Sequence, residues 1–256
     1  MTTTEVSPAA TLKFTYRAPT REFTSEEVDL LELKAARRAL LNLRTLLHGE
    51  PMRELIRAQV EAADNQWKEW LAASNGKWRE VRLDLGVEGF SATQMVQTLA
   101  ALQSQAAGGG DRDEFMIKFM YPMHPEHYVN PPYEVGGIVE TLGAMPTRLR
   151  LAPRQLDDMP DFVQKVADES YPLKQCANGE LDDGTTVGYL FHQYKDTPTG
   201  CDLIFRGFGP AAAPDFVIEE HEEHFAVEFR NFISNLAATA AKTGAAEGRP
   251  GERRHN

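Results

Sequence analysis

The sequence predicts an α+β protein in which a curved antiparallel sheet is covered by a long C-terminal helix, with a mostly helical region before it. Three observations favour this class. The first hundred residues are rich in segments with apolar residues every three or four positions, which is the helical period. Alternating, aromatic-rich segments separated by turn residues follow, as expected for strands. A last amphipathic segment begins after Pro214 and is predicted to be helical from Asp215 to about Lys242.

Composition divides the chain into three parts. Residues 1–110 are expected to form the mostly helical region, and 111–244 the sheet with the long helix. Residues 245–256 are a tail of low complexity that we expect to be disordered. The first boundary lies in the stretch AAGGGDRD, whose glycines predict a flexible joint.

The helical region begins with a capping signal. Thr24 and Glu27 have the spacing of a capping box, in which each side chain bonds the backbone N–H of the other residue. The segment VDLLELKAARRALLNLRTLL after them is strongly helix-forming, and Gly49 and Pro51 end it. A first helix is therefore expected between these two signals.

Two further helices are expected before the glycine-rich stretch. The second covers about residues 52–73, and its Trp67 and Trp70 should dock it on a neighbouring element. The third begins at Ser91, which Gln94 caps, and runs through ATQMVQTLAALQSQ. These three helices make up most of the N-terminal region.

The sheet is expected to be antiparallel, because its segments are joined by short turns. A short helix is predicted over residues 159–171. The long C-terminal helix would cover the concave face, and such an arrangement leaves space for a ligand between helix and sheet. The expected turns lie around Pro146, at Asn178-Gly179, at Asp183-Gly184 and at residues 198–200. The expected strands are EFMIKFMY (114–121), GGIVETLG (136–143), TRLRL (147–151), TTVGYLFHQYKD (185–196) and CDLIFRGFG (201–209).

Composition and charge exclude several classes of function. The 256 residues, 42% of them hydrophobic, suffice for a sizeable core. The net charge of −11 argues against nucleic acid or an anionic membrane as a partner, since both require clustered positive charge. The N-terminus has no signal pattern, and Cys176 and Cys201 form no disulfide framework. We therefore expect a soluble cytoplasmic protein, in which the N-terminal helices pack on the main domain or on a second copy in a homodimer.

The stretch IEEHEEHFAVEFRNFISNL, from Ile218 to Leu236, is the first candidate for a metal site. On a helix, His221, His224 and Glu228 share one face because they are three, four and seven positions apart. A carboxylate on the face that is buried requires a partner, and a divalent cation suits imidazole and carboxylate ligands together. The alternative is that these residues lie at a rim and only hydrogen-bond one another. The histidines are three apart, so the H-E-x-x-H motif of zinc proteases is absent.

Three other segments carry candidate groups. The proline-stiffened stretch YPMHPEHYVNPPYE contains His124, His127 and Asn130, and its prolines suit a preorganised site. Glu140 lies in an otherwise apolar strand, where it either enters a site or faces outward. His192 also lies in an apolar strand, where an ordinary core histidine is the alternative to a functional one.

Four segments occur in an order that is shared with a known enzyme family. HPEHY, VETLG and HFAVE stand where that family has a histidine after a Pro-acidic pair, a glutamate on a strand and an H-x-x-x-E motif on the last long helix. LFHQYKDTPTGCDLIFRGFG resembles its histidine-bearing hairpin. The chain thus resembles, over about residues 112–240, the C–C bond hydrolases typified by diacetylphloroglucinol hydrolase and phloretin hydrolase. The resemblance implies a helix-grip domain of the Bet v 1/START type.

The resemblance also implies a set of site residues. Asn130, Tyr121 and His192 would contact the substrate, and His192 and Tyr121 would also be catalytic, although the spacing of Tyr121 differs from the family pattern. His124 or His221 could replace one of the ligands. The interval between the first two ligands is shorter than in the family, which would change the pocket wall and hence the substrate. The implied metal ligands are His127, Glu140, His224 and Glu228.

The implied activity is metal-dependent hydrolysis of a bond between an acyl carbon and an aromatic ring carbon. Zinc is the first choice of cofactor, and iron, manganese or nickel also fit these ligand types. The expected substrate is a small aromatic or polyketide-like molecule. Two alternatives stay open on the same scaffold: a cyclase or dehydratase of polyketide-like molecules, and a non-catalytic carrier of small hydrophobic ligands.

Overall fold

The computed structural model describes residues 15–107, 115–129 and 138–247. The chain divides into two compact units, one ending at Leu43 and the other beginning at Arg44. The elements of the first unit are β1 (Tyr16–Arg17) and β2 (Glu22–Phe23), which pair antiparallel, and most of α1 (Ser25–Leu46).

Both predicted capping boxes are present. The backbone N–H of Thr24 donates to Glu27 Oε2 over 2.8 Å, and the N–H of Glu27 donates to Thr24 Oγ1 over 3.1 Å. Ser91 and Gln94 exchange the same pair of bonds, over 3.0 and 3.1 Å, at the start of α3 (Ala92–Ala107). Each pair satisfies two N–H groups that a helix start leaves without partners.

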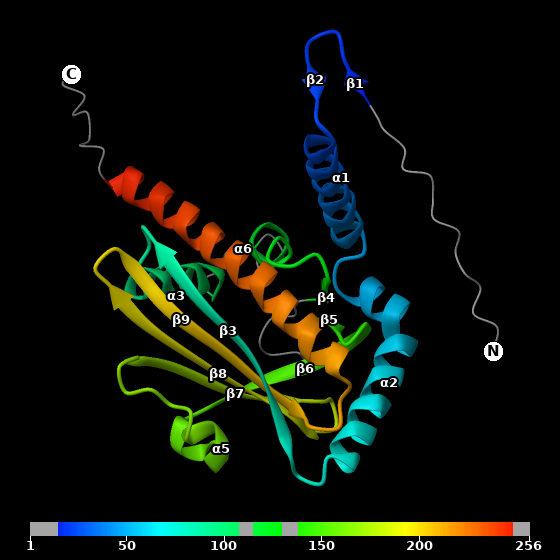
Figure 1. Cartoon of the computed structure of the whole chain (residues 1–256), viewed down its shortest axis with the longest axis vertical. Coiled ribbons are helices and arrows are strands. Elements are labelled where there is room, and N and C mark those ends of the chain that lie inside the picture. Colours follow the sequence, from blue (N-terminus) through cyan, green and yellow to red (C-terminus); the bar gives the residue numbers. More distant parts are fainter. Residues whose placement is uncertain (1–14, 108–114, 130–137, 248–256) are drawn as a thin grey trace. The chain divides into compact units, whose positions relative to one another are not determined.

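The second unit is built on an antiparallel sheet. Within the described residues, seven strands pair in the order β3-β9-β8-β7-β6-β5-β4, and α6 runs over the curled sheet (Figure 1). This arrangement confirms the predicted α+β class. None of the helices that the structure describes has a run apolar enough to cross a membrane. Besides α3, the elements are α2 (Glu50–Ala73), β3 (Trp78–Glu88), the π-helical turn η1 (Met116–Met120), β4 (His127–Val129), β5 (Ile138–Leu142), β6 (Met145–Arg154), the 3-10 turn η2 (Leu156–Asp158), α5 (Asp161–Gln164), β7 (Leu173–Glu180), β8 (Thr186–Thr197), β9 (Gly200–Pro210) and α6 (Asp215–Glu247).

The largest core cluster lies between α6 and the sheet. Phe205 of β9 is 1% exposed and stacks on Phe229 of α6, with ring centroids 3.5 Å apart and planes 7° from parallel. Alternate residues of a strand face the same side, so Leu203 points to the helix with Phe205. On α6 the buried stripe continues through Ile233 and Leu236, at helical spacing from Phe229. This packing fixes the position of the helix that carries two of the predicted ligands.

The first strand of the sheet comes from the region predicted to be mostly helical. β3 pairs with β9 along its whole length, from Trp78 opposite Pro210 to Glu88 opposite Gly200. A Cβ at Gly200 would overlap the carbonyl oxygen of Val87, so the close approach of these strands requires glycine there. The predicted boundary after residue 110 lies outside the described residues, and the division into compact units falls well before it.

One predicted strand is a helical turn instead. Residues 116–120 of EFMIKFMY form η1. The reason is visible in its aromatic rings: Phe115 and Phe119, four positions apart, stack with centroids 5.3 Å apart and planes at 16°. Phe119 also packs edge-on against Phe232 of α6. In a strand Phe115 and Phe119 would share a face but lie about 13 Å apart, too far for their rings to stack.

Two predicted turns lie elsewhere. Asn178-Gly179 is inside β7, where Gly179 faces a glycine of β8 across the strand pair. The turn predicted at Asp183-Gly184 is confirmed. Pro146 is inside β6, and the preceding turn is made by Gly143-Ala144, both with positive φ. The short helix predicted over 159–171 is confirmed only as the four residues of α5.

Trp67 docks α2 on β6, as predicted for the two tryptophans. Its ring is 5% exposed, and its Nε1–H donates to Thr147 Oγ1 over 3.0 Å.

We expect Thr147→Val to lower the free energy of unfolding by about 1–3 kcal/mol, because the buried indole N–H of Trp67 loses its acceptor. Urea unfolding measures this change. The control is Thr186→Val on β8, where the hydroxyl makes no hydrogen bond among the described residues; an equal loss there would contradict the assignment.

Candidate metal centre

The pairing of β4 with β5 brings the first two predicted ligands together. His127 lies directly opposite Glu140 in this antiparallel register, so both side chains are on the same face. Nε2 of His127 is 3.0 Å from Oε2 of Glu140. His127 is completely buried, and the Glu140 side chain is 14% exposed.

α6 brings the other two predicted ligands to the same point. His224 and Glu228 are four positions apart on its buried face, with Nε2 and Oε2 3.7 Å apart. His224 Nε2 is 3.0 Å from His127 Nε2 and 3.5 Å from Glu140 Oε2. Glu228 Oε1 is 3.8 Å from His127 Nε2. Four side chains from three distant segments therefore converge; their role as metal ligands stays a prediction.

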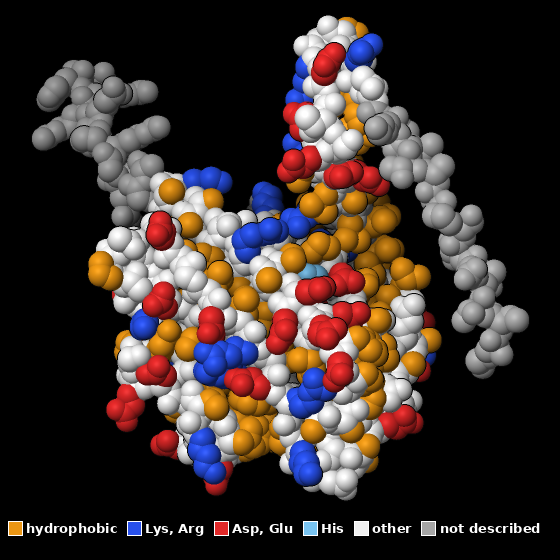
Figure 2. Space-filling model, in the orientation of Figure 1, with side chains coloured by type: hydrophobic (Ala, Val, Ile, Leu, Met, Phe, Trp, Pro, Cys, Tyr) orange, Lys and Arg blue, Asp and Glu red, His pale blue; other side chains and the backbone are white. Residues whose placement is uncertain are grey.

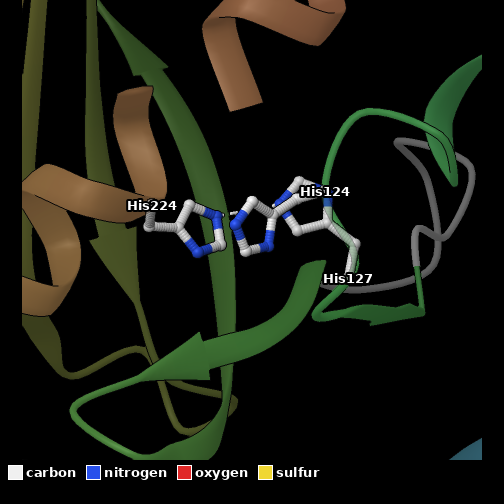
Figure 3. Close-up of side chains that lie close together, drawn as sticks. All are labelled: His124, His127 and His224. Atoms are coloured by element: carbon white, nitrogen blue, oxygen red, sulfur yellow. Dashed lines mark hydrogen bonds between the residues drawn. The ribbon is translucent and has the colours of Figure 1, made fainter. Parts of the chain in front are cut away.

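A third histidine lies beside them. His124, His127 and His224 are all buried, and each offers a ring nitrogen within 4.8 Å of those of the other two, so the three can bind a metal ion (Figure 3). His124 stacks on His224, with ring centroids 3.8 Å apart and planes at 25°. The geometry thus allows His124 to replace one of the proposed ligands, as expected from the sequence.

Hydrogen bonding indicates the tautomer of one of the three rings. The backbone N–H of Glu126 donates to Nδ1 of His124 over 3.1 Å, which in a neutral ring leaves the proton on Nε2. Nδ1 of His127 and Nδ1 of His224 are buried without a hydrogen-bond partner among the described residues. Nε2 of His127 or His224 can bind a cation when the proton of the neutral ring is on Nδ1.

The pKa values of the two carboxyl groups are shifted in opposite directions. Burial acts to raise the pKa of Glu140, but the charge of His224 and the hydrogen bonds of both histidines outweigh it and hold that pKa well below its ordinary value. Burial raises the pKa of Glu228, and the nearby charge of Glu140 adds to this against the effect of His127. Burial opposes a charge on His224, yet Glu140 raises the pKa of that ring. Two buried carboxylates this close are unfavourable unless cationic charge lies between them.

A cavity of about 600 Å³ adjoins the cluster. His124 and His224 form part of its wall, so the histidines are reached from outside the core. Glu126, Glu220 and Glu223 make the lining acidic. On the face in Figure 2, an imidazole is visible at the surface beside acidic side chains.

Neither Tyr121 nor His192 lines the cavity beside the cluster. Tyr121 is fully buried, and its hydroxyl is 2.8 Å from Nδ1 of His48. His192 packs against the rings of Phe205 and Phe229, and burial lowers its pKa to about 3, so it is uncharged at neutral pH. Asn130 lies outside the described residues.

His221, the other alternative ligand, is half-buried. Its ring packs edge-on against Phe225, with centroids 4.5 Å apart, and burial lowers its pKa to about 4. It is not part of the group of three histidines.

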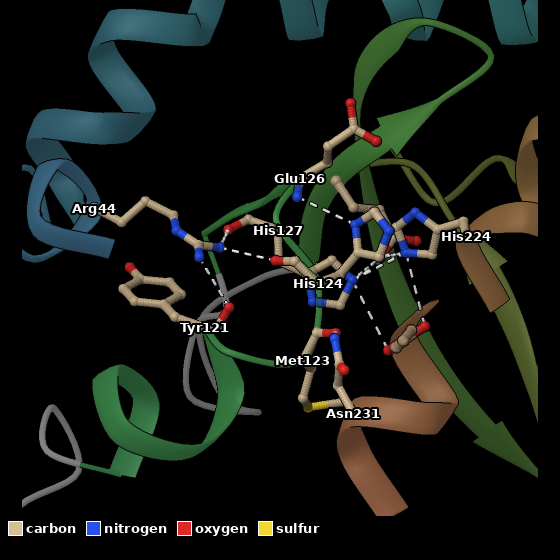
Figure 4. A network of polar contacts seen from close by, with 10 residues as sticks. Arg44, Tyr121, Met123, His124, Glu126, His127, His224 and Asn231 are labelled. Carbon is tan, nitrogen blue, oxygen red and sulfur yellow. Dashed lines mark hydrogen bonds and ion pairs between the residues drawn. The ribbon is translucent and has the colours of Figure 1, made fainter. Parts of the chain in front are cut away.

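Two residues that sequence reasoning missed hold the segment that carries His124 and His127. The Arg44 guanidinium donates to three backbone carbonyls of this segment. Nδ2 of Asn231 in α6 donates to the carbonyl of Met123 over 2.9 Å (Figure 4). Asn231 could have been found, because it lies seven positions after His224 on the same helical face. No pattern in the sequence indicates Arg44.

No family model matches this chain, and no curated protein matches it. What stands is a curled antiparallel sheet with a long C-terminal helix and a buried cluster of three histidines that can bind a metal ion.

Proposed function

We propose that the chain is a metal-dependent hydrolase that cleaves the bond between an acyl carbon and a phenolic ring carbon. The observation that carries this proposal is the convergence of two imidazoles and two carboxylates within 3.0 to 3.8 Å. The order of segments that resembles the C–C bond hydrolases supplies the reaction type. The ligands in this proposal are His127, Glu140, His224 and Glu228.

The spacing of the four groups supports a single ion. Ligand atoms that bind zinc in a tetrahedron, at about 2.0–2.1 Å each, lie about 3.4 Å from one another. The separations between the four groups, 3.0 to 3.8 Å, fall on both sides of that value. Two neutral imidazoles and two carboxylates carry a charge that a divalent ion neutralises. His124 is the weaker candidate for a ligand, since the amide of Glu126 occupies its Nδ1 lone pair.

The overall reaction adds water to the acyl–ring bond. The hydroxyl of water goes to the acyl carbon, the acyl–ring bond breaks, and its electron pair stays on the ring carbon, which takes up a proton. A divalent cation in this shell supplies Lewis-acid chemistry, because it makes water acidic near neutral pH and polarises a carbonyl oxygen. A phenolic hydroxyl assists, since its keto tautomer turns the leaving ring carbon into the carbon of an enolate.

In this proposal, the substrate is bound by residues that are not metal ligands. We assign His192 and Asn130 to the phenolic oxygens, with Tyr121 as a further candidate. The uncharged ring of His192 suits a hydrogen bond rather than proton donation as an imidazolium. A cavity of about 600 Å³ is large enough for a small aromatic molecule. Its acidic lining favours an uncharged substrate and repels the carboxylate product.

Removal of the metal tests this function. The purified protein is expected to contain a divalent ion by elemental analysis and to release a carboxylic acid from an uncharged acylphenol. Chelator treatment should abolish the release, and added Zn²⁺ should restore it. A protein that holds the metal but converts polyketide-like molecules without releasing acid would be a cyclase or dehydratase. A metal-free protein that only binds acylphenols would be a carrier, and either result contradicts the proposal.

A further inference from the structure

One guanidinium holds the segment that carries His124 and His127. Arg44 is 3% exposed. Its Nη1 donates to the carbonyl oxygens of His124 and His127, over 3.0 and 2.7 Å, and its Nη2 donates to the carbonyl oxygen of Tyr121 over 2.9 Å (Figure 4). Three carbonyls of residues 121–127 thus point at a single cation. The planar fork of arginine suits several acceptors at fixed angles.

These carbonyls stabilise the buried positive charge of Arg44. In the described part of the chain Arg44 forms no ion pair, and its Cζ lies 4.9 Å from the centre of the Tyr121 ring. Burial lowers the pKa of Arg44, but an arginine stays protonated in proteins. A buried guanidinium that loses its acceptors is strongly unfavourable, so the carbonyls are held in place.

The same segment is fixed from the side of α6. Asn231 donates to the carbonyl of Met123 and lies three positions after Glu228, on the face that carries the candidate ligands. The segment is therefore bonded by Arg44 on one side and by the ligand-bearing helix on the other. The backbone conformation of this segment therefore sets the position of the His127 side chain.

We propose that Arg44 is a positioning residue of the metal centre, which fixes the backbone from which Nε2 of His127 reaches His224 and Glu140. The effect on metal binding rests on the proposed function, whereas the placement of the His127 ring does not. Arg44 does not itself line the cavity, and its bonds to His124 and His127 are made to their carbonyl oxygens, so it acts through the backbone.

The first measurement is the zinc affinity of Arg44→Met and Arg44→Lys, determined by competition with a chromophoric chelator. We expect Arg44→Met to weaken zinc binding by about 10- to 100-fold, the range found when an outer partner of a ligand is lost. Lysine keeps the charge but not the fork, so Arg44→Lys should weaken it less. The control is Arg57→Met, an exposed arginine of α2 that pairs with Glu54 and Glu61; the zinc affinity of this variant should stay within about twofold of wild type.

The ring signals of His127 in the zinc-free protein are the second measurement, by long-range ¹H–¹⁵N NMR. They should shift in Arg44→Met and stay unchanged in Arg57→Met. A folded Arg44→Met protein with unchanged zinc affinity and unchanged His127 signals would overturn the proposal. Should Arg44→Met not fold, Arg44→Lys is judged by the same two results. Should the wild type bind no zinc, the proposed function fails, and the His127 signals alone decide the role of Arg44.

Discussion

Glu228→Gln is expected to lose both the bound metal and the hydrolysis of acylphenols. The substitution keeps the shape of the side chain but removes one of the two carboxylates that face the imidazoles of His127 and His224. If Glu228 is a ligand as proposed, its loss should weaken metal binding by more than the 10- to 100-fold found for an outer partner. Elemental analysis and turnover measure the two effects. The matched control is Glu222→Gln, an exposed acid of the same helix, which should change neither.

Protein stability adds a third readout to this experiment. Metal at about 100 times its dissociation constant should stabilise the wild type by about 2.7 kcal/mol and leave Glu228→Gln unchanged. Without metal, the variant should be at least as stable as the wild type, because it removes one of two neighbouring buried carboxylates. A metal site made of the three histidines predicts the reverse pattern, in which His124→Ala loses the metal and Glu228→Gln keeps it. That pattern would contradict the proposed ligand set.

Phe205→Ala is expected to lower the free energy of unfolding by about 3–5 kcal/mol. The Phe205 ring is almost completely buried between β9 and α6, where it stacks on Phe229, so its removal leaves a cavity that neither element can close. Urea unfolding measures the loss, provided that the slope of the transition stays the same. Phe205→Leu, which fills part of the cavity, should lose less.

Phe216 provides the control for this core substitution. It lies in the first turn of α6 and is 44% exposed. We expect Phe216→Ala to change the free energy of unfolding by no more than about 0.5 kcal/mol. Similar losses at the two positions would show that α6 is not held by the stack of Phe205 and Phe229.

Much of the fold follows from local patterns. The capping pairs at Thr24 and Ser91 mark helix starts because they depend only on neighbours in the chain. β3 was missed although it carries a strand signal, with Val81, Leu83 and Leu85 alternating with charged residues. The segment of η1 was misread because its aromatic residues fit both an alternating and a helical period, and only the contact with α6 decides between them.

The candidate site was predictable in parts. Helical spacing alone puts His224 and Glu228 on one face. That His127 lies opposite Glu140 depends on the register of β4 with β5, which only the family resemblance suggested. Arg44 is far from this segment in the sequence, and a buried arginine that bonds carbonyl groups has no recognisable local pattern.

The distribution of the four groups along the chain bears on how the protein is made. His127 and Glu140 leave the ribosome long before the α6 residues that complete the cluster, and β3 likewise waits for β9. A nascent chain of this length therefore exposes an unpaired strand edge and only half of a binding site, a state that is prone to aggregate. For the proposed metal site, metal acquisition would therefore follow synthesis, and the ions present in the compartment at that moment would decide which one is captured.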